Sequence, residues 1–278
     1  MIINFTKMHS LGNDFIIIDT ITQNIKLHNA YIKKIANRHI GIGCDQVILI
    51  EPPIHPLSDF YYKIYNSNGK IAEQCLNGAR CAARFALDAG LVNKKIITAD
   101  CLAGQVIFTV EDNQSIAANL GNLNPIIDSI SLKLKHLDKP CQLYNLSIGN
   151  PHAIYLINFQ HSDINQEKEY KELDHQIYSS LAEDIANQDM FSQGINIGFA
   201  KIVDYNTIQL RVFERGAGET LSCGTNAVAA FVVAKHLHLI DNQAKILFKL
   251  GNLQINLDNN DLIIKGPTNS IFTGKFKI

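Results

Sequence analysis

The chain has 278 residues, of which 46% are hydrophobic and 18% are charged, and its net charge is −1 at pH 7. This composition excludes a disordered chain, which has few apolar residues and usually a high net charge. The balanced charge also argues against a nucleic-acid-binding protein, which needs clustered Lys and Arg. We expect a globular protein with room for about two domains.

The first ten residues lack a basic segment followed by a long apolar stretch, so we expect a cytoplasmic protein. The apolar runs, such as residues 15–18 and 227–234, are far shorter than the roughly 20 residues that a membrane span requires. No membrane association is therefore expected. The six cysteines contain no Cys-x-x-Cys pair, and their pattern predicts neither a disulfide framework nor a zinc site.

Short β-branched or aromatic runs, separated by Gly, Pro and Asn, predict strands along the whole chain. In the first half they cover residues 15–19, 46–51, 60–65, 96–99 and 105–110. In the second half they cover residues 153–157, 195–202, 207–213, 245–250 and 253–257. Residues 165–189 are charged and mildly helical, which predicts an exposed helical insertion. Few helices alternate with the strands, so an α+β fold with antiparallel or mixed sheets is favoured over a doubly wound parallel sheet.

The chain contains an internal repeat. The segment at residues 10–13, SLGN, has a counterpart in SIGN at residues 147–150, and an apolar run follows each. Cys75 and Cys223 are 148 residues apart, and each precedes a stripe of small residues at helical spacing. The stripes are Ala79, Ala82, Ala83 and Ala86, then Ala227, Ala230, Phe231 and Ala234. We predict one amphipathic helix used twice, with Asn77 and Gly78, or Thr225 and Asn226, as cap-like residues at its start.

The repeat predicts two similar, pseudo-symmetric domains, each a mixed or antiparallel sheet around a central helix. Residues 119–125, NLGNLNP, are rich in turn formers and predict the boundary between them. We expect an N-terminal half at residues 1–120, a C-terminal half at 121–266, and a last segment, 267–278, that returns to the first half.

Equivalent positions in such halves would place Cys75 and Cys223 on opposite sides of an interdomain cleft. At a helix N-terminus, free N–H groups and the helix dipole favour an anion and lower a thiol pKa from about 8.5. Two opposed thiols could remove a proton from one face of a carbon and return one to the other face. This is the chemistry of a racemase or epimerase without a cofactor, and the same helix ends could bind an α-carboxylate.

Four blocks of the sequence resemble the diaminopimelate epimerase family over nearly the whole chain. They are MHSLGNDF at residues 8–15, NSNG at 66–69 with CLNGARC at 75–81, GNPH at 149–152, and FERGAGET at 213–220 with CGT at 223–225. The resemblance implies an isomerase that interconverts LL- and meso-2,6-diaminopimelate for lysine and peptidoglycan precursor synthesis. It implies no cofactor. His236 and His238 are two residues apart near a predicted helix end and would point to different faces, so no metal site is expected.

By the same resemblance, Cys75 and Cys223 are the acid/base pair, and His152 and Glu214 tune the two thiols. A nearby cation lowers a thiol pKa and a carboxylate raises it. Arg215 would pair with the carboxylate at the non-reacting end of the substrate. The implied substrate-binding residues are Asn13, Gln46, Asn66, Leu76, Asn77, Asn150, Asn196, Glu214, Arg215, Gly224 and Thr225. In the family, the region around Phe272 often lies at a homodimer interface, so a dimer is expected.

Three positions depart from the family pattern, since Leu76 and Asn226 stand where glycine is usual and Asn68 where aspartate is usual. Because Leu76 lies beside the first thiol, where its side chain could crowd a substrate, a binding protein that has kept the pocket and lost the activity is an alternative. A proline or hydroxyproline racemase-like isomerase also fits the two-domain plan, although such enzymes usually have histidine at the position of Asn77.

A single cysteine acting as nucleophile, with His152 as its base, would instead give a hydrolase or transferase. The remaining thiols have no such symmetry, and we expect them in the core. They are Cys44, Cys81, Cys101 and Cys141.

Overall fold

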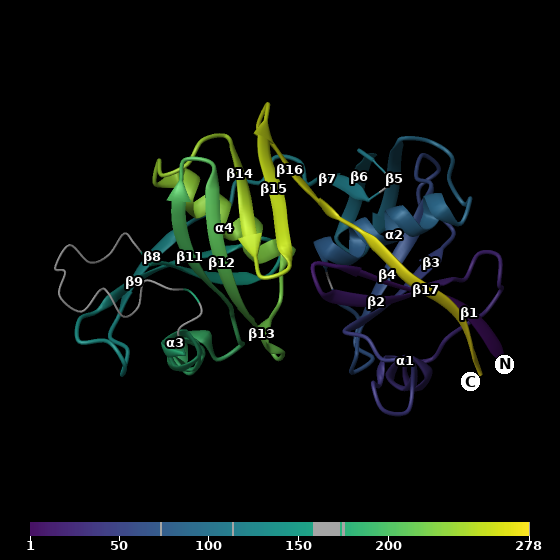
Figure 1. The fold of residues 1–278 in the computed structure, drawn as a ribbon, viewed down its shortest axis with the longest axis horizontal. Coiled ribbons are helices and arrows are strands. Elements are labelled where there is room, and N and C mark those ends of the chain that lie inside the picture. The colour runs from purple at the N-terminus through teal and green to yellow at the C-terminus, as the bar shows by residue number, and fades with distance from the viewer. Residues whose placement is uncertain (73, 113, 158–172, 174–175, 278) are drawn as a thin grey trace. The chain divides into compact units, whose positions relative to one another are not determined.

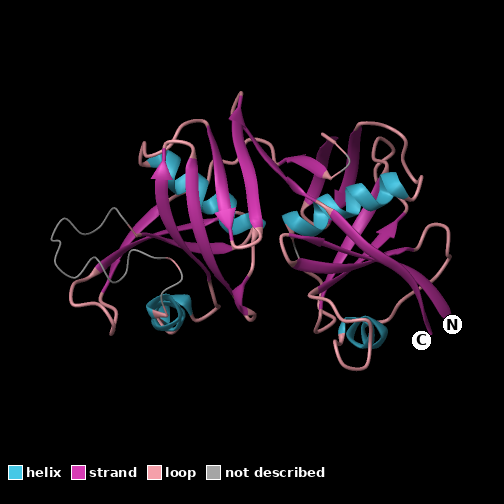
Figure 2. Cartoon of the chain, in the orientation of Figure 1, coloured by secondary structure: helices cyan, strands magenta, loops and turns pink. Residues whose placement is uncertain are grey.

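The structure, a computed structural model, describes residues 1–72, 74–112, 114–157, 173 and 176–277 (Figure 1). The chain divides into two compact units, Met1–Gly121 with Ile263–Ile278 and Asn122–Leu262. Helices and mixed sheets are present in both, which confirms the predicted α+β class (Figure 2). Within the described ranges, every helix is too short or too polar to cross a bilayer.

The first unit is a curved run of paired strands with two helices. Its strands are β1 (Ile2–Ser10), β2 (Asn13–Asp19), β3 (Gln46–Glu51), β4 (Phe60–Asn66), β5 (Ile96–Cys101), β6 (Gly104–Val110), β7 (Ser115–Asn119), most of β16 (Asp261–Pro267) and β17 (Asn269–Lys277). They pair in the order β17, β1, β2, β3, β4, β5, β6, β7, β16. The pairs β2–β3 and β4–β5 are parallel. Parallel strands need a crossover connection, and α1 (Asn29–Ala36) and α2 (Leu76–Asp88) supply the two.

The second unit repeats this plan. Its strands are β8 (Asp128–Leu132), β9 (Cys141–Ser147), β10 (Pro151–Leu156), β11 (Asn196–Asp204), β12 (Thr207–Glu214), β13 (Gly218–Thr220), β14 (Gln243–Phe248) and β15 (Gly251–Asp258). They pair in the order β8, β9, β10, β11, β12, β14, β15, and β13 pairs with the end of β12. The pairs β10–β11 and β12–β14 are parallel, with α3 (Ile177–Ala186) and α4 (Gly224–His236) in their crossovers. A 3-10 turn, Asp189–Phe191, follows α3.

Each unit wraps its sheet around one long helix. α2 packs against β1, β2, β3, β4, β6 and β7, and α4 packs against β9, β10, β11, β12, β14 and β15. The two predicted alanine stripes are confirmed as core, since every alanine in them is fully buried. The prediction that both helices are amphipathic is wrong for α4, because each residue from Gly224 to Phe231 is buried. Over these residues the helix is surrounded by its sheet and has no solvent face to keep polar.

The starts of the central helices also differ from the prediction. The helices begin at Leu76 and Gly224, so the cysteines themselves are the N-cap residues, ahead of the predicted cap-like residues. Both cysteines have extended backbone angles, as N-cap residues do. The two thiols therefore lie directly at the free N–H groups of the first helical turn.

Two shorter helices were misjudged from the sequence. α1 was not predicted, because its eight residues give only a brief pattern, with Ile32, Ile35 and Ala36 buried. Of the predicted exposed insertion at 165–189, residues 165–172, 174 and 175 lie outside the described residues. In the remainder, α3 is not an exposed helix, since Tyr178 and Ile185 are buried in the core of the second unit.

Candidate functional site

In the first unit, the predicted site residues gather at one end of neighbouring strands. Asn13 is the first residue of β2 and Gln46 the first of β3, whereas Asn66 is the last of β4. Gln46 is opposite Asn66 in the β3–β4 register, and its Nε2 donates to Asn66 Oδ1 at 2.9 Å. The Gln46 Oε1 atom is buried and accepts no hydrogen bond from the described residues.

Cys75 has a hydrogen-bond partner for each of its protonation states. As a thiol it donates to Asn13 Oδ1, at a distance of 3.5 Å from Sγ. As a thiolate it accepts from the Gly78 backbone N–H, with the two atoms 3.4 Å apart. Asn77 Nδ2 also donates to Asn13 Oδ1, at 3.5 Å. An acid/base group needs both forms to be accessible, and this arrangement supplies contacts for both.

Asn13 is oriented by a charged cluster behind it. Its Nδ2 donates to Asp45 Oδ2 at 3.0 Å, and Asp45 also accepts from Arg38 at 2.8 Å. Arg38 forms two further hydrogen bonds with Asp14, which Lys7 also contacts. Burial alone would raise the pKa of Asp14, but the hydrogen bonds from Arg38 and Lys7 outweigh it and hold that pKa well below its usual range.

In the second unit, the corresponding residues occupy the corresponding strand ends. Asn150 immediately precedes β10, Asn196 is the first residue of β11, and Glu214 is the last of β12. Cys223 then caps α4, as Cys75 caps α2. The predicted site residues therefore form two groups, one in each unit, at equivalent places in a repeated topology.

Cys223 is held in its neutral form. Burial raises the pKa of this thiol well above its ordinary value, and the Glu214 carboxylate raises it further, whereas contacts from Thr225 and the Asn226 N–H lower it. Its Sγ atom is 3.3 Å from Thr225 Oγ1, and Thr220 Oγ1 donates to Glu214 at 2.5 Å. The direction of the Glu214 effect is the one expected for a carboxylate beside a thiol.

His152 differs from its expected electrostatic role. The side chain is fully buried on β10, and burial lowers its pKa to about 3. The ring is therefore neutral at pH 7 and cannot act as the cation that was expected to lower a thiol pKa. Its Nε2 atom is 2.8 Å from Asn150 Oδ1, so a neutral ring orients the Asn150 carboxamide.

Asn196 and Arg215 are joined through the backbone. Asn196 Nδ2 donates to the Pro151 carbonyl at 2.9 Å, and Asn196 Oδ1 accepts from the Arg215 backbone N–H at 3.1 Å. Both polar ends of the Asn196 side chain are thus engaged in positioning neighbouring segments. The Arg215 guanidinium donates to the Gln193 carbonyl at 3.5 Å, a long contact that leaves it available for an anion.

The backbone at position 76 does not require the glycine that is usual there, so Leu76 fits without strain. It is the first residue of α2 and does not have a positive φ, so any L-residue can adopt its backbone conformation. The side chain is 2% exposed. Gly224 is the equivalent first residue of α4, and Thr225 follows it next to Cys223.

Sequence reasoning missed three residues that support these groups. Asp45 orients Asn13, Asp14 accepts from the Asp45 backbone N–H, and Arg80 donates to Asn77. Arg80 lies three residues after Asn77 on the same helix, a spacing that could have indicated the contact. The four cysteines expected in the core, Cys44, Cys81, Cys101 and Cys141, are all buried.

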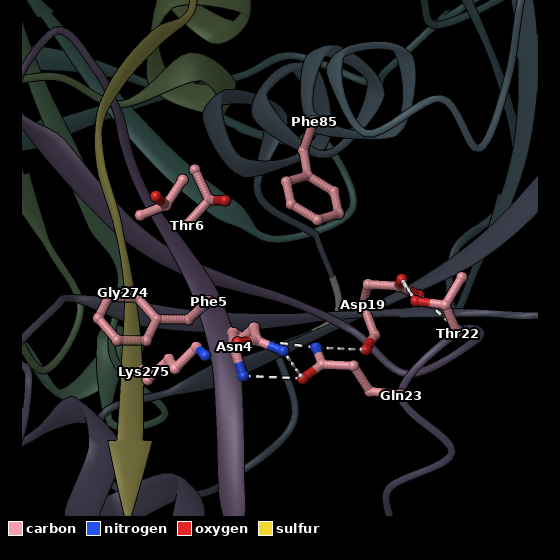
Figure 3. Close-up of a pocket in the computed structure, with 10 residues that line it drawn as sticks. Asn4, Phe5, Thr6, Asp19, Thr22, Gln23, Phe85, Gly274 and Lys275 are labelled. Carbon is pink, nitrogen blue, oxygen red and sulfur yellow. Dashed lines mark hydrogen bonds between the residues drawn. The ribbon is translucent and has the colours of Figure 1, made fainter.

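A hollow of about 530 Å³ in the first unit lies apart from these residues (Figure 3). Phe5 and Phe85 line it together with Asp19 and Lys275, and Gln23 is hydrogen-bonded to Asn4 at its edge. None of the predicted site residues is among the residues that line it.

Solved structures with the same fold include several isomerases. A probable proline racemase from Agrobacterium radiobacter K84 is 13% identical, with a TM-score of 0.72 over 99% of this chain and 93% of that one. A hydroxyproline epimerase from Agrobacterium vitis is 11% identical, with a TM-score of 0.70 over 99% and 92% of the two chains. A phenazine biosynthesis protein of the PhzF family from Enterococcus faecalis is 13% identical, with a TM-score of 0.67 over the whole of both chains. At these identities the likeness shows the fold alone.

A family model described as diaminopimelate epimerase matches residues 5–125 and 144–270. The match includes both cysteine-capped helices and every strand end described above. The chain therefore belongs to the diaminopimelate epimerase family, and it is an isomerase of that family.

Proposed function

We propose that this protein is a cofactor-independent epimerase that interconverts LL- and meso-2,6-diaminopimelate with Cys75 and Cys223 as its two acid/base groups. The reaction would serve lysine and peptidoglycan precursor synthesis in the cytoplasm. The proposal deepens the family assignment, because it names a substrate and a mechanism for this chain.

One observation carries the proposal. Cys75 and Cys223 are the N-cap residues of the two central helices, in units whose strands pair in the same alternation. A nucleophilic mechanism needs one thiol and gives the repeat no purpose. Inversion of a carbon needs two proton-transferring groups, one for each face, and a duplicated unit supplies them.

The protonation states of the two thiols suit them for different roles in the reaction. Because burial and Glu214 hold Cys223 in the thiol form, it is suited to donate a proton first. Cys75, with the Gly78 N–H available to its thiolate, would remove the α-hydrogen. The pair of electrons left on the α-carbon then takes the Cys223 proton. After one turnover Cys75 is a thiol and Cys223 a thiolate, so the next turnover can run in the reverse direction.

The polar groups suit a substrate with ammonium and carboxylate groups at both ends. The unpaired, buried Gln46 Oε1 atom can accept from a ligand ammonium. The helix N-termini beside Gly78 and Asn226 can donate to the α-carboxylate as negative charge develops next to it. Arg215 would bind the distal carboxylate, with two parallel hydrogen bonds where the geometry allows.

The proposal is tested by hydrogen exchange in deuterium oxide. Purified, reduced protein without pyridoxal phosphate should replace the α-hydrogen of diaminopimelate with deuterium, followed by loss of the α-proton signal in NMR. Exchange that appears only after pyridoxal phosphate is added would exclude the two-thiol mechanism.

The same assay separates the proposal from its nearest alternative. L-proline and trans-4-hydroxy-L-proline, incubated in parallel, should keep their α-hydrogens. Exchange with either of them and none with diaminopimelate would instead identify a proline racemase-like isomerase. Tight calorimetric binding of diaminopimelate without exchange would identify a binding protein.

We further propose that the protein is a homodimer that pairs through β17. Ile271 and Phe272 on this strand are large apolar residues that are 54% and 49% exposed, and pairing through β17 would cover them. Light scattering should give twice the chain mass of 31.0 kDa, and I271K should reduce it to the monomer value. A monomeric wild-type protein at micromolar concentration would contradict this.

A further inference from the structure

Arg80, on the second turn of α2, is the largest fully buried side chain among the described residues, with 0% of its surface exposed. Its Nη2 atom donates to Asn77 Oδ1 at 2.7 Å and to Ser10 Oγ at 3.1 Å. Its Nε and Nη1 atoms have no partner in the described part of the chain. In the described part of the chain the contacts of Arg80 are to neutral groups and include no carboxylate, although a buried charge is costly without one.

A series of hydrogen bonds through Asn77 and Asn13 connects Arg80 to Cys75. Because Asn77 Oδ1 accepts from Arg80, the Nδ2 atom of the same carboxamide faces Asn13 Oδ1. That oxygen is the atom to which the Cys75 thiol donates. A rotated Asn77 carboxamide would present an oxygen to Asn13 Oδ1 and break this sequence of contacts.

The charge of Arg80 also acts on the thiol. Burial lowers the pKa of Arg80 to about 10, and the nearby Cys81 and Cys75 oppose this, so the guanidinium remains charged at pH 7. Burial raises the pKa of Cys81, and it raises that of Tyr62 on β4, another titratable group that interacts with Cys75. Both are neutral at pH 7. Cys75 is therefore the group near Arg80 whose ionisation can balance the buried cation.

We propose that Arg80 is a positioning residue that holds the Asn77 and Asn13 carboxamides around Cys75 and supplies the positive charge beside which the Cys75 thiolate forms. Its importance for turnover rests on the proposed epimerase function. The effect of Arg80 on the Cys75 thiol does not depend on that function, because it is a property of the protein without substrate.

The test is the pH dependence of Cys75 alkylation by iodoacetamide, measured on the Cys75 peptide by mass spectrometry in the absence of substrate. An opposite charge beside an acid typically shifts its titration by one to three pH units. In R80Q, which removes the charge but keeps a hydrogen-bond donor, the alkylation midpoint should rise by at least about one pH unit. In R80K, which keeps the charge, it should rise by less.

Arg84 provides the matched control. It is on the same helix, is 6% exposed, and forms an ion pair with Asp88 and a hydrogen bond to the Asp112 carbonyl. R84Q makes the same chemical change in a buried arginine and should leave the Cys75 midpoint unchanged. Circular dichroism identifies variants that have lost the fold, and R80K serves as the second variant if R80Q has.

Two results would overturn the proposal. One is a folded R80Q protein with the wild-type midpoint, and the other is an equal shift in R84Q. If wild-type protein shows no exchange with diaminopimelate but the R80Q shift is present, the proposed function fails while the role of Arg80 in controlling the thiol stands. If wild-type protein shows exchange with diaminopimelate but R80Q shows no shift, the proposed function stands and the role of Arg80 fails.

Discussion

Asn13 lies between Asp45 and Cys75, donating to the carboxylate through Nδ2 at 3.0 Å and accepting from the thiol through Oδ1 at 3.5 Å. The carboxylate can only accept hydrogen bonds, so it determines which end of the Asn13 carboxamide faces the thiol. The Asp45 carboxylate thus sets the orientation of a candidate substrate-binding residue beside the Cys75 thiol.

This relationship predicts that D45A lowers activity with little loss of stability. An exposed ion pair contributes about 0–1 kcal/mol, so removal of the Asp45–Arg38 pair should change the thermal midpoint only slightly. Loss of the Asn13 orientation should lower kcat by about tenfold, equivalent to about 1.4 kcal/mol. E51A, which removes a comparable ion pair with Lys63, is the control and should keep wild-type kcat. Equal kcat values for D45A and E51A would refute the role of Asp45.

The two-thiol mechanism predicts that C75A and C223A each abolish epimerisation while the protein remains folded. Removal of a general acid or base typically costs about 10²–10⁴-fold in rate. Turnover is measured by polarimetry and folding by circular dichroism. C141A removes a buried thiol whose pKa burial raises to about 11, and it should retain activity. Wild-type turnover in C75A or C223A would remove that residue from the mechanism.

The proposed two-thiol mechanism also predicts sensitivity to oxidation. A disulfide requires the two Cα atoms to come within about 7 Å, so a Cys75–Cys223 bridge would form only if the two cysteines approach each other across one site. Mild oxidation should abolish activity, dithiothreitol should restore it, and peptide mapping should identify the bridge. The C75S and C223S variants should not form it. Oxidised, inactive protein without this bridge would contradict the prediction.

His152 predicts a pH dependence of stability. Its folded-state pKa is lowered by burial from 6.5 to about 3, so below pH 6.5 the unfolded chain binds a proton that the folded protein does not. The contribution of neutral His152 to the free energy of unfolding is therefore complete above pH 6.5 and is lost as the pH falls toward 3. H152Q, which does not titrate, should therefore lose stability less steeply than wild type between pH 6.5 and pH 4. Urea unfolding at a series of pH values measures this, and parallel curves for the two proteins would show that His152 is not held neutral.

The sequence by itself determined the repeat, the fold class and the two helices that follow the cysteines. These are local properties: alanines at helical spacing and β-branched runs between turn residues predict elements without knowledge of their partners. α1 was missed because an eight-residue helix draws its stability from tertiary packing, here of Ile32 and Ile35, and little of it from its own sequence.

Only the tertiary structure decided the environment of each group. The neutral state of His152, the thiol state of Cys223 and the burial of Gly224 to Phe231 on α4 depend on how much of the sheet surrounds them. Likewise, the link from Arg80 through Asn77 and Asn13 to Cys75 connects β2 with α2. Desolvation and hydrogen bonding depend on distances between segments far apart in the chain, and a linear pattern of residue types does not contain those distances.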